Sequence, residues 1–184
     1  MDTSQTLKVI GAAFDGVARP DISLRQFLLT DQKGLAGTVT DQAWLEAGNR
    51  RNDSRWQEIP DAEIEECGVV LAHMEAPEFQ YYLPAYMRYA VRHLHLDFWK
   101  WEILAMTVAS LHPSLYPMDV WPHAVAKYSL FTRAQRQAAT QFLRFVVESA
   151  ADIFRPEAKD ALERDWTDDV VRDGFDTSVL VGPN

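Results

Sequence analysis

The chain has 184 residues, which is long enough to bury the core of one domain. Its hydrophobic fraction of 47% and charged fraction of 24% are typical of a folded, water-soluble protein and exclude a chain that is disordered throughout. The formal net charge of −9 disfavours binding to nucleic acid or to an anionic membrane and favours a basic partner.

The acidic side chains fall in two blocks. Residues 51–80 carry eight acidic and two basic side chains, and residues 146–184 carry ten acidic and four basic ones. Cys67 is the single cysteine, so an intrachain disulfide is excluded and a reducing compartment is favoured. The N-terminus lacks the features of a secretory signal, and no apolar run approaches the roughly 20 residues that span a bilayer. We therefore expect a cytoplasmic protein with no membrane partner.

Apolar residues recur at helical spacing from the start of the chain. Residues 4–17 are predicted to form an amphipathic helix, which the chain leaves at Pro20. Ser23 can cap a second, short helix, and Thr40 or Asp41 a third, because these side chains accept hydrogen bonds from the first free amides of a helix.

Stronger helical patterns occupy the middle of the chain. Asp61 is predicted to cap a helix whose apolar stripe runs to Met74. Residues 79–82 are expected to be extended, with Pro84 in the first turn of the next helix. Residues 98–111 have almost no polar interruption, so we expect them to form the central and most buried helix.

The C-terminal part has the clearest helix start. Thr132 and Gln135 have capping-box spacing, and Pro156 is predicted to begin a last, charged helix. No alternation with period two competes with these helical patterns. The sequence thus predicts an all-α domain of six to eight helices over residues 1–167, arranged as an orthogonal or irregular bundle, followed by an acidic tail over residues 168–184.

One part of the sequence resembles a known family. The resemblance covers roughly residues 55–145 and rests on Trp56-x-x-Ile59-Pro60, Phe79-x-Tyr81-Tyr82-Leu83-Pro84-Ala85-Tyr86-Met87 and Thr132-x-x-Gln135. It points to uncharacterised bacterial proteins with a Tyr-Leu-Pro-Ala hallmark, and Tyr-Leu-Pro-Ala is its only distinctive stretch. The resemblance implies a bacterial origin and no mechanism. Small proteins of this kind are also loosely similar to immunity proteins that neutralise toxins.

The tyrosines of this segment allow two interpretations. Their rings can fill the core and their hydroxyls can bind backbone groups, which is the usual fate of aromatic residues beside a helix start. Alternatively, three of them are exposed and anchor a protein partner, because tyrosine is enriched at interfaces. The candidate anchors are Tyr81, Tyr86 and Tyr89.

A crowd of carboxylates precedes the aromatic segment. Mutual repulsion destabilises such a cluster unless a cationic partner compensates, and a negative surface accelerates encounter with a basic protein. A plain solvated surface is the alternative. The candidate partner-binding residues are Glu58, Asp61, Glu63, Glu65 and Glu66.

A catalytic site is not evident in the sequence. His93 and His95 are two apart on a predicted helix and therefore point away from each other, so they cannot share a metal ion. Cys67 lies on an apolar stripe, where a thiol is inert and has a raised pKa. We expect no catalytic residue, metal ligand or cofactor. The alternative is a site between helices built from His73, His112 and a carboxylate.

Glu102 is the carboxylate considered for such an enzyme. Its apolar neighbours predict burial, which requires pairing with Arg88, Arg92 or Lys100, or else a functional role. Our main hypothesis is instead a non-catalytic, cytoplasmic inhibitor of the immunity or antitoxin type, which occludes a basic cytosolic toxin. A structural or regulatory subunit is a further alternative, and the sequence does not indicate the oligomeric state.

Overall fold

The computed structural model describes residues 2–33, 37–94, 101–150 and 152–176, and these residues form ten α-helices and no strand. The all-α prediction is confirmed. The helices outnumber the six to eight expected because three of them are single short segments of six residues. The helices are α1 (Thr3–Ala13), α2 (Leu24–Lys33), α3 (Asp41–Asn49), α4 (Asp61–Glu66), α5 (Ala76–His93), α6 (Trp101–Ala109), α7 (Trp121–Ala126), α8 (Arg133–Ser149), α9 (Arg155–Arg164) and α10 (Asp168–Asp173).

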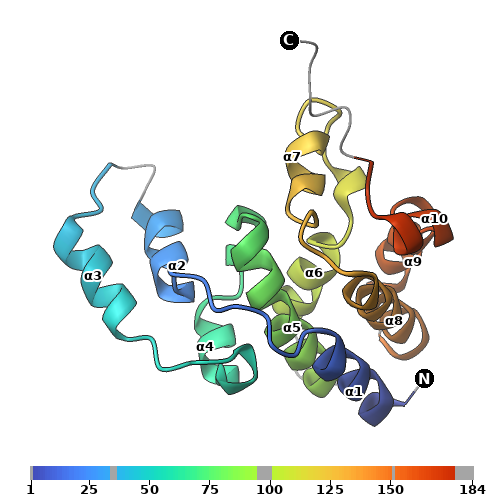
Figure 1. The fold of residues 1–184 in the computed structure, drawn as a ribbon, viewed down its shortest axis with the longest axis horizontal. Helices are drawn as coiled ribbons and strands as arrows, with labels where there is room; N and C mark the ends of the chain where they lie inside the picture. The colour runs from blue at the N-terminus through green and yellow to red at the C-terminus, as the bar shows by residue number, and fades with distance from the viewer. Residues whose placement is uncertain (1, 34–36, 95–100, 151, 177–184) are drawn as a thin grey trace.

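Helix α5 lies at the centre of the fold (Figure 1). Helices α1, α6 and α8 pack against it, and α8 in turn carries α9 and α10 on one side of the molecule. Helices α2 and α3 form a pair on the opposite side. No residue of α3 is buried, so this helix is held mainly by α2. Within the part of the chain that the structure describes, three 3₁₀ helices connect the elements: η2 (Trp56–Glu58), η3 (Val70–His73) and η5 (Pro113–Leu115).

The aromatic segment is helical, which corrects the prediction of an extended stretch. Pro77 occupies the first turn of α5, and Pro84 lies in the interior of the helix. An interior proline removes one backbone hydrogen bond and costs about 3 kcal/mol. Burial offsets this cost, because every residue from 81 to 91 is buried and each large apolar side chain contributes about 1.5–3 kcal/mol. The side chains of α5 therefore face protein on all sides, and this helix is the core of the domain.

The central position predicted for residues 98–111 is wrong. Helix α6 begins at Trp101 within the described residues and buries only four side chains: Ile103, Leu104, Thr107 and Val108. Its apolar sequence therefore covers one flank of α5. The expected start at Phe98 lies outside the described residues.

Helix ends follow the sequence more closely. Thr132 and Gln135 form the predicted capping box at the start of α8. Asp61, the predicted N-cap, is instead the first residue of α4, and Pro60 holds the cap position. Helix α10 occupies part of the segment predicted as a tail, and Arg136 of α8 donates hydrogen bonds to its Val171 and Arg172 carbonyl oxygens. No described helix has both the length and the apolarity that crossing a bilayer requires.

Candidate functional site

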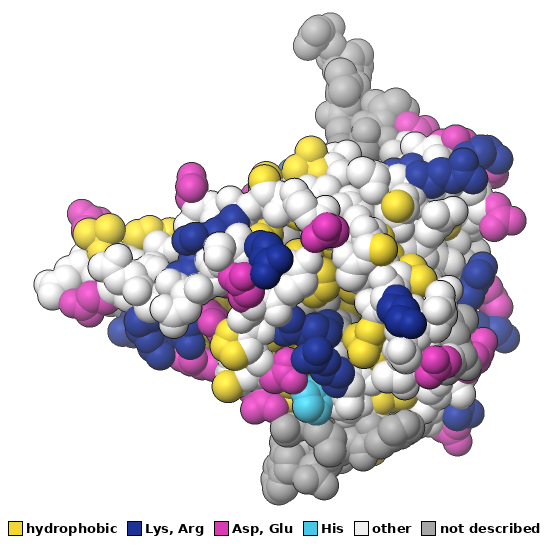
Figure 2. All heavy atoms as spheres, turned by 60° about the horizontal axis from the view of Figure 1, so that its bottom comes forward, with side chains coloured by type: hydrophobic (Ala, Val, Ile, Leu, Met, Phe, Trp, Pro, Cys, Tyr) yellow, Lys and Arg dark blue, Asp and Glu magenta, His cyan; other side chains and the backbone are white. Residues whose placement is uncertain are grey.

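The surface does not present a uniform acidic patch on the face shown in Figure 2, where basic and acidic side chains are interspersed. The interspersion has a structural cause. The acidic residues singled out in the sequence bind cationic or hydroxyl groups of the same chain.

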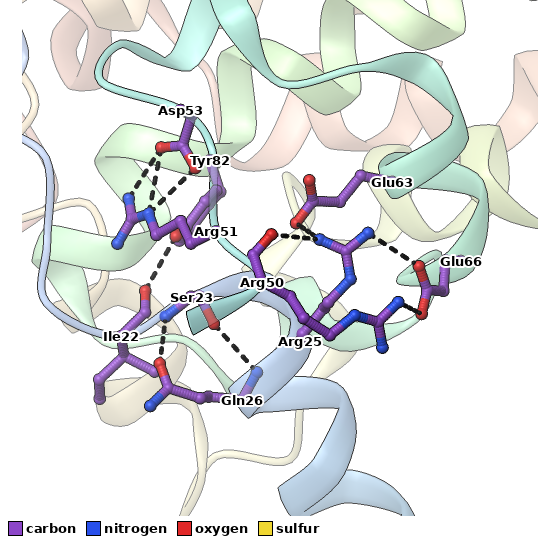
Figure 3. Close-up of polar contacts among 10 residues, drawn as sticks. All are labelled: Ile22, Ser23, Arg25, Gln26, Arg50, Arg51, Asp53, Glu63, Glu66 and Tyr82. Carbon is purple, nitrogen blue, oxygen red and sulfur yellow. Dashed lines mark hydrogen bonds and ion pairs between the residues drawn. The ribbon is translucent and has the colours of Figure 1, made fainter. Parts of the chain in front are cut away.

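Arg25 of α2 neutralises part of α4. Its Nη1 lies 2.7 Å from Oε1 of Glu63, and its Nη2 lies 3.0 Å from Oε2 of Glu66 (Figure 3). Arg50 approaches the other oxygen of Glu66 at 3.5 Å. Burial raises the pKa of Glu63, and the positive charge of Arg25 offsets this effect only in part. These pairs dock α2 onto α4 and leave little free charge on Glu63.

Asp61 faces α5. Its carboxylate lies 2.9 Å from Nε2 of His93, 3.5 Å from Nη2 of Arg88 and 3.7 Å from Nη1 of Arg92. Arg88 also donates to the carbonyl oxygens of Gln57 at 2.7 Å and Ile59 at 2.5 Å. Asp61 is therefore part of a bridge between α4, η2 and α5.

Glu58 and Glu65 also have partners. The backbone amide and the hydroxyl of Ser54 each donate to Glu58 at 2.9 Å, and these bonds, with those from Arg55, lower the pKa of Glu58 to about 2. Tyr89 donates its hydroxyl hydrogen to Glu65 at 2.7 Å. Each of the five predicted partner-binding carboxylates thus has a bond or ion pair within the chain.

The three candidate anchor tyrosines are buried, so the expectation that they are exposed is wrong. Tyr81 donates to Asp53 at 2.6 Å, Tyr86 to the backbone oxygen of Cys67, and Tyr89 to Glu65. The core interpretation of the aromatic segment is confirmed. The physical reason is that α5 is surrounded by other elements, so every residue from 81 to 91 is buried whichever side of the helix it is on.

A buried ion pair lies where α5 meets the loop before η2. Arg51 and Asp53 are joined at 2.9 Å, and their side chains are only 3% and 4% exposed. Burial opposes ionisation of Asp53, but hydrogen bonds from Arg51 and Tyr81 outweigh it and lower the pKa of Asp53. Arg51 also donates to the backbone oxygen of Pro20 at 2.5 Å. Figure 3 shows that Tyr82 donates to the backbone oxygen of Ile22, at 2.8 Å. The pair is a structural clasp rather than a reactive group.

The residues considered for an enzymatic site are not brought together. Glu102 is exposed, which corrects its predicted burial, and it lines a pocket of about 430 Å³ together with Glu65 and Glu66. His73 pairs with Asp31 at 3.0 Å. Among the described residues, no three His, Cys, Asp or Glu side chains are grouped so that they could hold a metal ion. Cys67 is buried, and burial raises its pKa to about 12, as predicted.

His112 belongs to a separate buried cluster. Its Nδ1 lies 2.5 Å from Oδ2 of Asp165, and its Nε2 lies 3.0 Å from Oδ2 of Asp160. The hydroxyl of Ser114 donates to Asp165 as well, and Trp166 donates its indole hydrogen to the backbone oxygen of Leu111 at 2.6 Å. This His112 cluster fastens the end of α9 to η5. In this cluster Ser114 donates to Asp165, and each ring nitrogen of His112 faces a carboxylate.

Sequence reasoning missed Lys127. This lysine follows α7, is only 5% exposed and lines a pocket of about 240 Å³. Its ammonium group lies 4.8 Å from the ring centroid of Phe79, 5.7 Å from that of Tyr116 and 5.8 Å from that of Tyr128. None of the described carboxylates lies within ion-pair distance of it. We call this the Lys127 pocket.

Electrostatics make Lys127 unusual. Burial lowers its pKa to about 8, whereas the three aromatic ring faces favour the charged form and oppose that shift. The sequence did contain a signal. Lys127 is the one lysine or arginine between Val120 and Phe131, and the apolar residues around it favour burial of its amine.

An exposed apolar segment borders the same pocket. Met118 is 83% exposed, Leu115 52% and Val120 39%. All three lie within residues 113–122, where Pro113, Pro117 and Pro122 restrict the backbone. We call these three side chains the apolar connector.

Comparison with known proteins places the chain in a family. No curated protein and no solved structure matches it. A family described as a family of unknown function, DUF6714, matches residues 2–170, which is most of the chain. The protein therefore belongs to the DUF6714 family of proteins of unknown function.

Proposed function

We propose that the protein is a non-catalytic, protein-binding protein whose contact surface is the apolar connector. The observation that supports this most is the exposure of Met118, Leu115 and Val120 on a segment held by three prolines. Exposed apolar side chains that lie together on an ordered segment are a feature of protein interaction sites. A pre-ordered segment also loses little conformational entropy when it binds.

Charge favours a basic partner over a second copy of the chain. Two copies would each carry a net charge of −9 and repel each other, whereas a cationic protein would be attracted. Asp119 lies between Met118 and Val120 and is exposed, so a carboxylate stands within the contact surface itself. This differs from the predicted contact through α4, whose carboxylates are bound within the chain. Inhibition of a basic toxin is the narrower form of the proposal and stays a prediction.

The proposal is tested with two matched charge substitutions. Met118→Glu and Ile153→Glu each place a carboxylate on an exposed apolar position, but only the first lies in the apolar connector. Immobilised wild-type protein and Ile153→Glu should retain a stoichiometric basic protein from the native host, and Met118→Glu should lose it. Retention by all three proteins, or by none, would contradict the proposal. Sedimentation analysis should show that the wild-type protein is a monomer. If it is instead a dimer that Met118→Glu dissociates, the apolar connector binds a second copy of the chain and not a basic partner.

A further inference from the structure

The Lys127 pocket combines an amine with an apolar wall. Only 5% of Lys127 is exposed to solvent, yet this residue lines a cavity of about 240 Å³. Met74, Val120 and Ala124 provide apolar surface, while His73, Glu75 and His123 provide groups that exchange protons. The position of Lys127 is fixed by α5 and the segment after η5, because the rings of Phe79 and Tyr116 enclose its side chain.

A lysine that is merely structural is normally paired with a carboxylate or extended into solvent. Lys127 does neither among the described residues, and only aromatic rings and the cavity face its amine. Amines in such surroundings are the ones that proteins use as nucleophiles, since desolvation increases the uncharged fraction. Burial lowers the pKa of Lys127 to about 8, so a substantial uncharged fraction exists near neutral pH.

We propose that Lys127 is a nucleophilic amine that forms an imine with a small aldehyde or ketone admitted to the Lys127 pocket. This inference is independent of the proposed protein-binding function, because a ligand in the pocket does not require a partner on the apolar connector. The occupant is a carbonyl compound with a short chain, since the wall offers apolar surface from Met74, Val120 and Ala124 beside its polar groups, and the cavity measures about 240 Å³.

The step is chemically balanced without an oxidant or a reductant. The nitrogen lone pair attacks the carbonyl carbon, a C–N bond forms, the C=O π bond breaks, and a proton moves from nitrogen to oxygen to give a carbinolamine. A second proton on the hydroxyl then lets the C–O bond break and water leave, while the nitrogen lone pair forms the C=N bond of the protonated imine. His73, Glu75 and His123 are the pocket groups that can carry these protons. The protonated imine is again a cation, and the ring faces that surround the amine stabilise it.

Reductive trapping tests this directly. Wild-type protein is incubated with propanal and sodium cyanoborohydride at pH 7.5, and the modified lysines are quantified by peptide mapping. Lys159, which is exposed, serves as a control within the same chain. We expect Lys127 to be modified at least about tenfold faster than Lys159, because a larger fraction of its amine is uncharged. A rate at Lys127 equal to or below that at Lys159 would overturn the proposal.

Two variants separate the amine from the cavity. Val120→Trp fills the pocket from a partly exposed position and leaves Lys127 in place, so the advantage of Lys127 over Lys159 should fall by about tenfold or more. Lys127→Arg keeps the cation, and trapping at this position should disappear while circular dichroism shows an unchanged fold. An undiminished rate in Val120→Trp would show that the cavity is not the route to the amine and would overturn the inference.

Discussion

Arg51 and Asp53, two residues apart in the chain, form an ion pair that is almost completely excluded from solvent, with Nη2 of Arg51 2.9 Å from Oδ2 of Asp53. Each partner also holds another part of the fold. Asp53 accepts a hydrogen bond from Tyr81 of α5, and Arg51 donates to the backbone of Pro20. The loop before η2 is thereby attached to both the central helix and the segment before α2.

Removal of the Asp53 charge should be strongly destabilising. Asp53→Asn keeps the shape of the side chain but leaves Arg51 as an uncompensated buried cation, a change that costs about 3–5 kcal/mol. Urea unfolding should show this loss. Glu58→Gln is the matched control, because it breaks the exposed pair with Arg55, which solvent screens, and should cost much less than Asp53→Asn. Equal effects of the two substitutions would contradict the clasp role of Asp53.

The His112 cluster should also contribute to stability. Asp165→Asn removes the charge that faces Nδ1 of His112 while preserving volume, and we expect a loss of about 2–4 kcal/mol. Asp160→Asn should cost less, because Asp160 is about half exposed and its pair is screened by solvent. Thermal and urea unfolding of both variants measure the difference. If Asp160→Asn proved the more damaging substitution, the proposed anchoring of α9 through Asp165 would be incorrect.

The capping box of α8 gives a smaller, local prediction. Thr132→Ala removes the side-chain acceptor of the Gln135 amide and should lower the free energy of unfolding by about 1 kcal/mol. Thr132→Ser retains an acceptor and should restore most of this loss. The urea midpoints of the three proteins measure these differences in stability. If Thr132→Ser is as destabilised as Thr132→Ala, the stabilisation comes from the methyl group of Thr132 and not from its capping hydrogen bond.

The charge of Lys127 should produce a rise in stability at alkaline pH. Its folded pKa of about 8 lies below the ordinary lysine value of 10.5, so between these values the unfolded chain binds more protons than the native protein. The free energy of unfolding then increases with pH, by up to about 3 kcal/mol between pH 8 and 10.5. The buried thiol and tyrosines act in the opposite direction. Burial raises the pKa of Cys67 from 9 to about 12 and that of Tyr86 and Tyr128 well above 10, so these groups lower stability above about pH 9.

Lys127→Met isolates this contribution. Its unfolding free energy, measured by urea between pH 7.5 and 11, should lack the alkaline rise contributed by Lys127, while the losses from Cys67 and the buried tyrosines remain. A rise of equal size in both proteins would assign the effect to another group.

Local sequence signals predicted helices and helix starts well. The α8 capping box, the cap at Thr40 or Asp41 and the helical period of residues 4–17 depend on neighbours within one or two turns. The structure contains the capping box and the Thr40 cap, and its first helix ends at Ala13, four residues before the predicted end. The conformation of α5 could not be predicted in this way. A proline favours the first turn of a helix, but Pro77 already occupies that position, and the burial that compensates Pro84 depends on helices far away in the chain.

The candidate site was harder to predict for the same reason. The acidic residues of α4 suggested a free negative surface, yet their cationic partners Arg25 and Arg88 lie 38 residues before Glu63 and 27 residues after Asp61. Lys127 meets Phe79 across a separation of 48 residues. Contacts at such sequence distances follow from packing of whole helices, which no local pattern encodes.

Helix α3 buries no side chain and packs mainly on α2. Its unfolding is therefore less strongly coupled to the unfolding of the rest of the domain. Helix α3 can open while the α1–α5–α8 core stays intact, because that opening exposes little apolar surface. Its amide hydrogens should therefore exchange with deuterium ahead of those in α5.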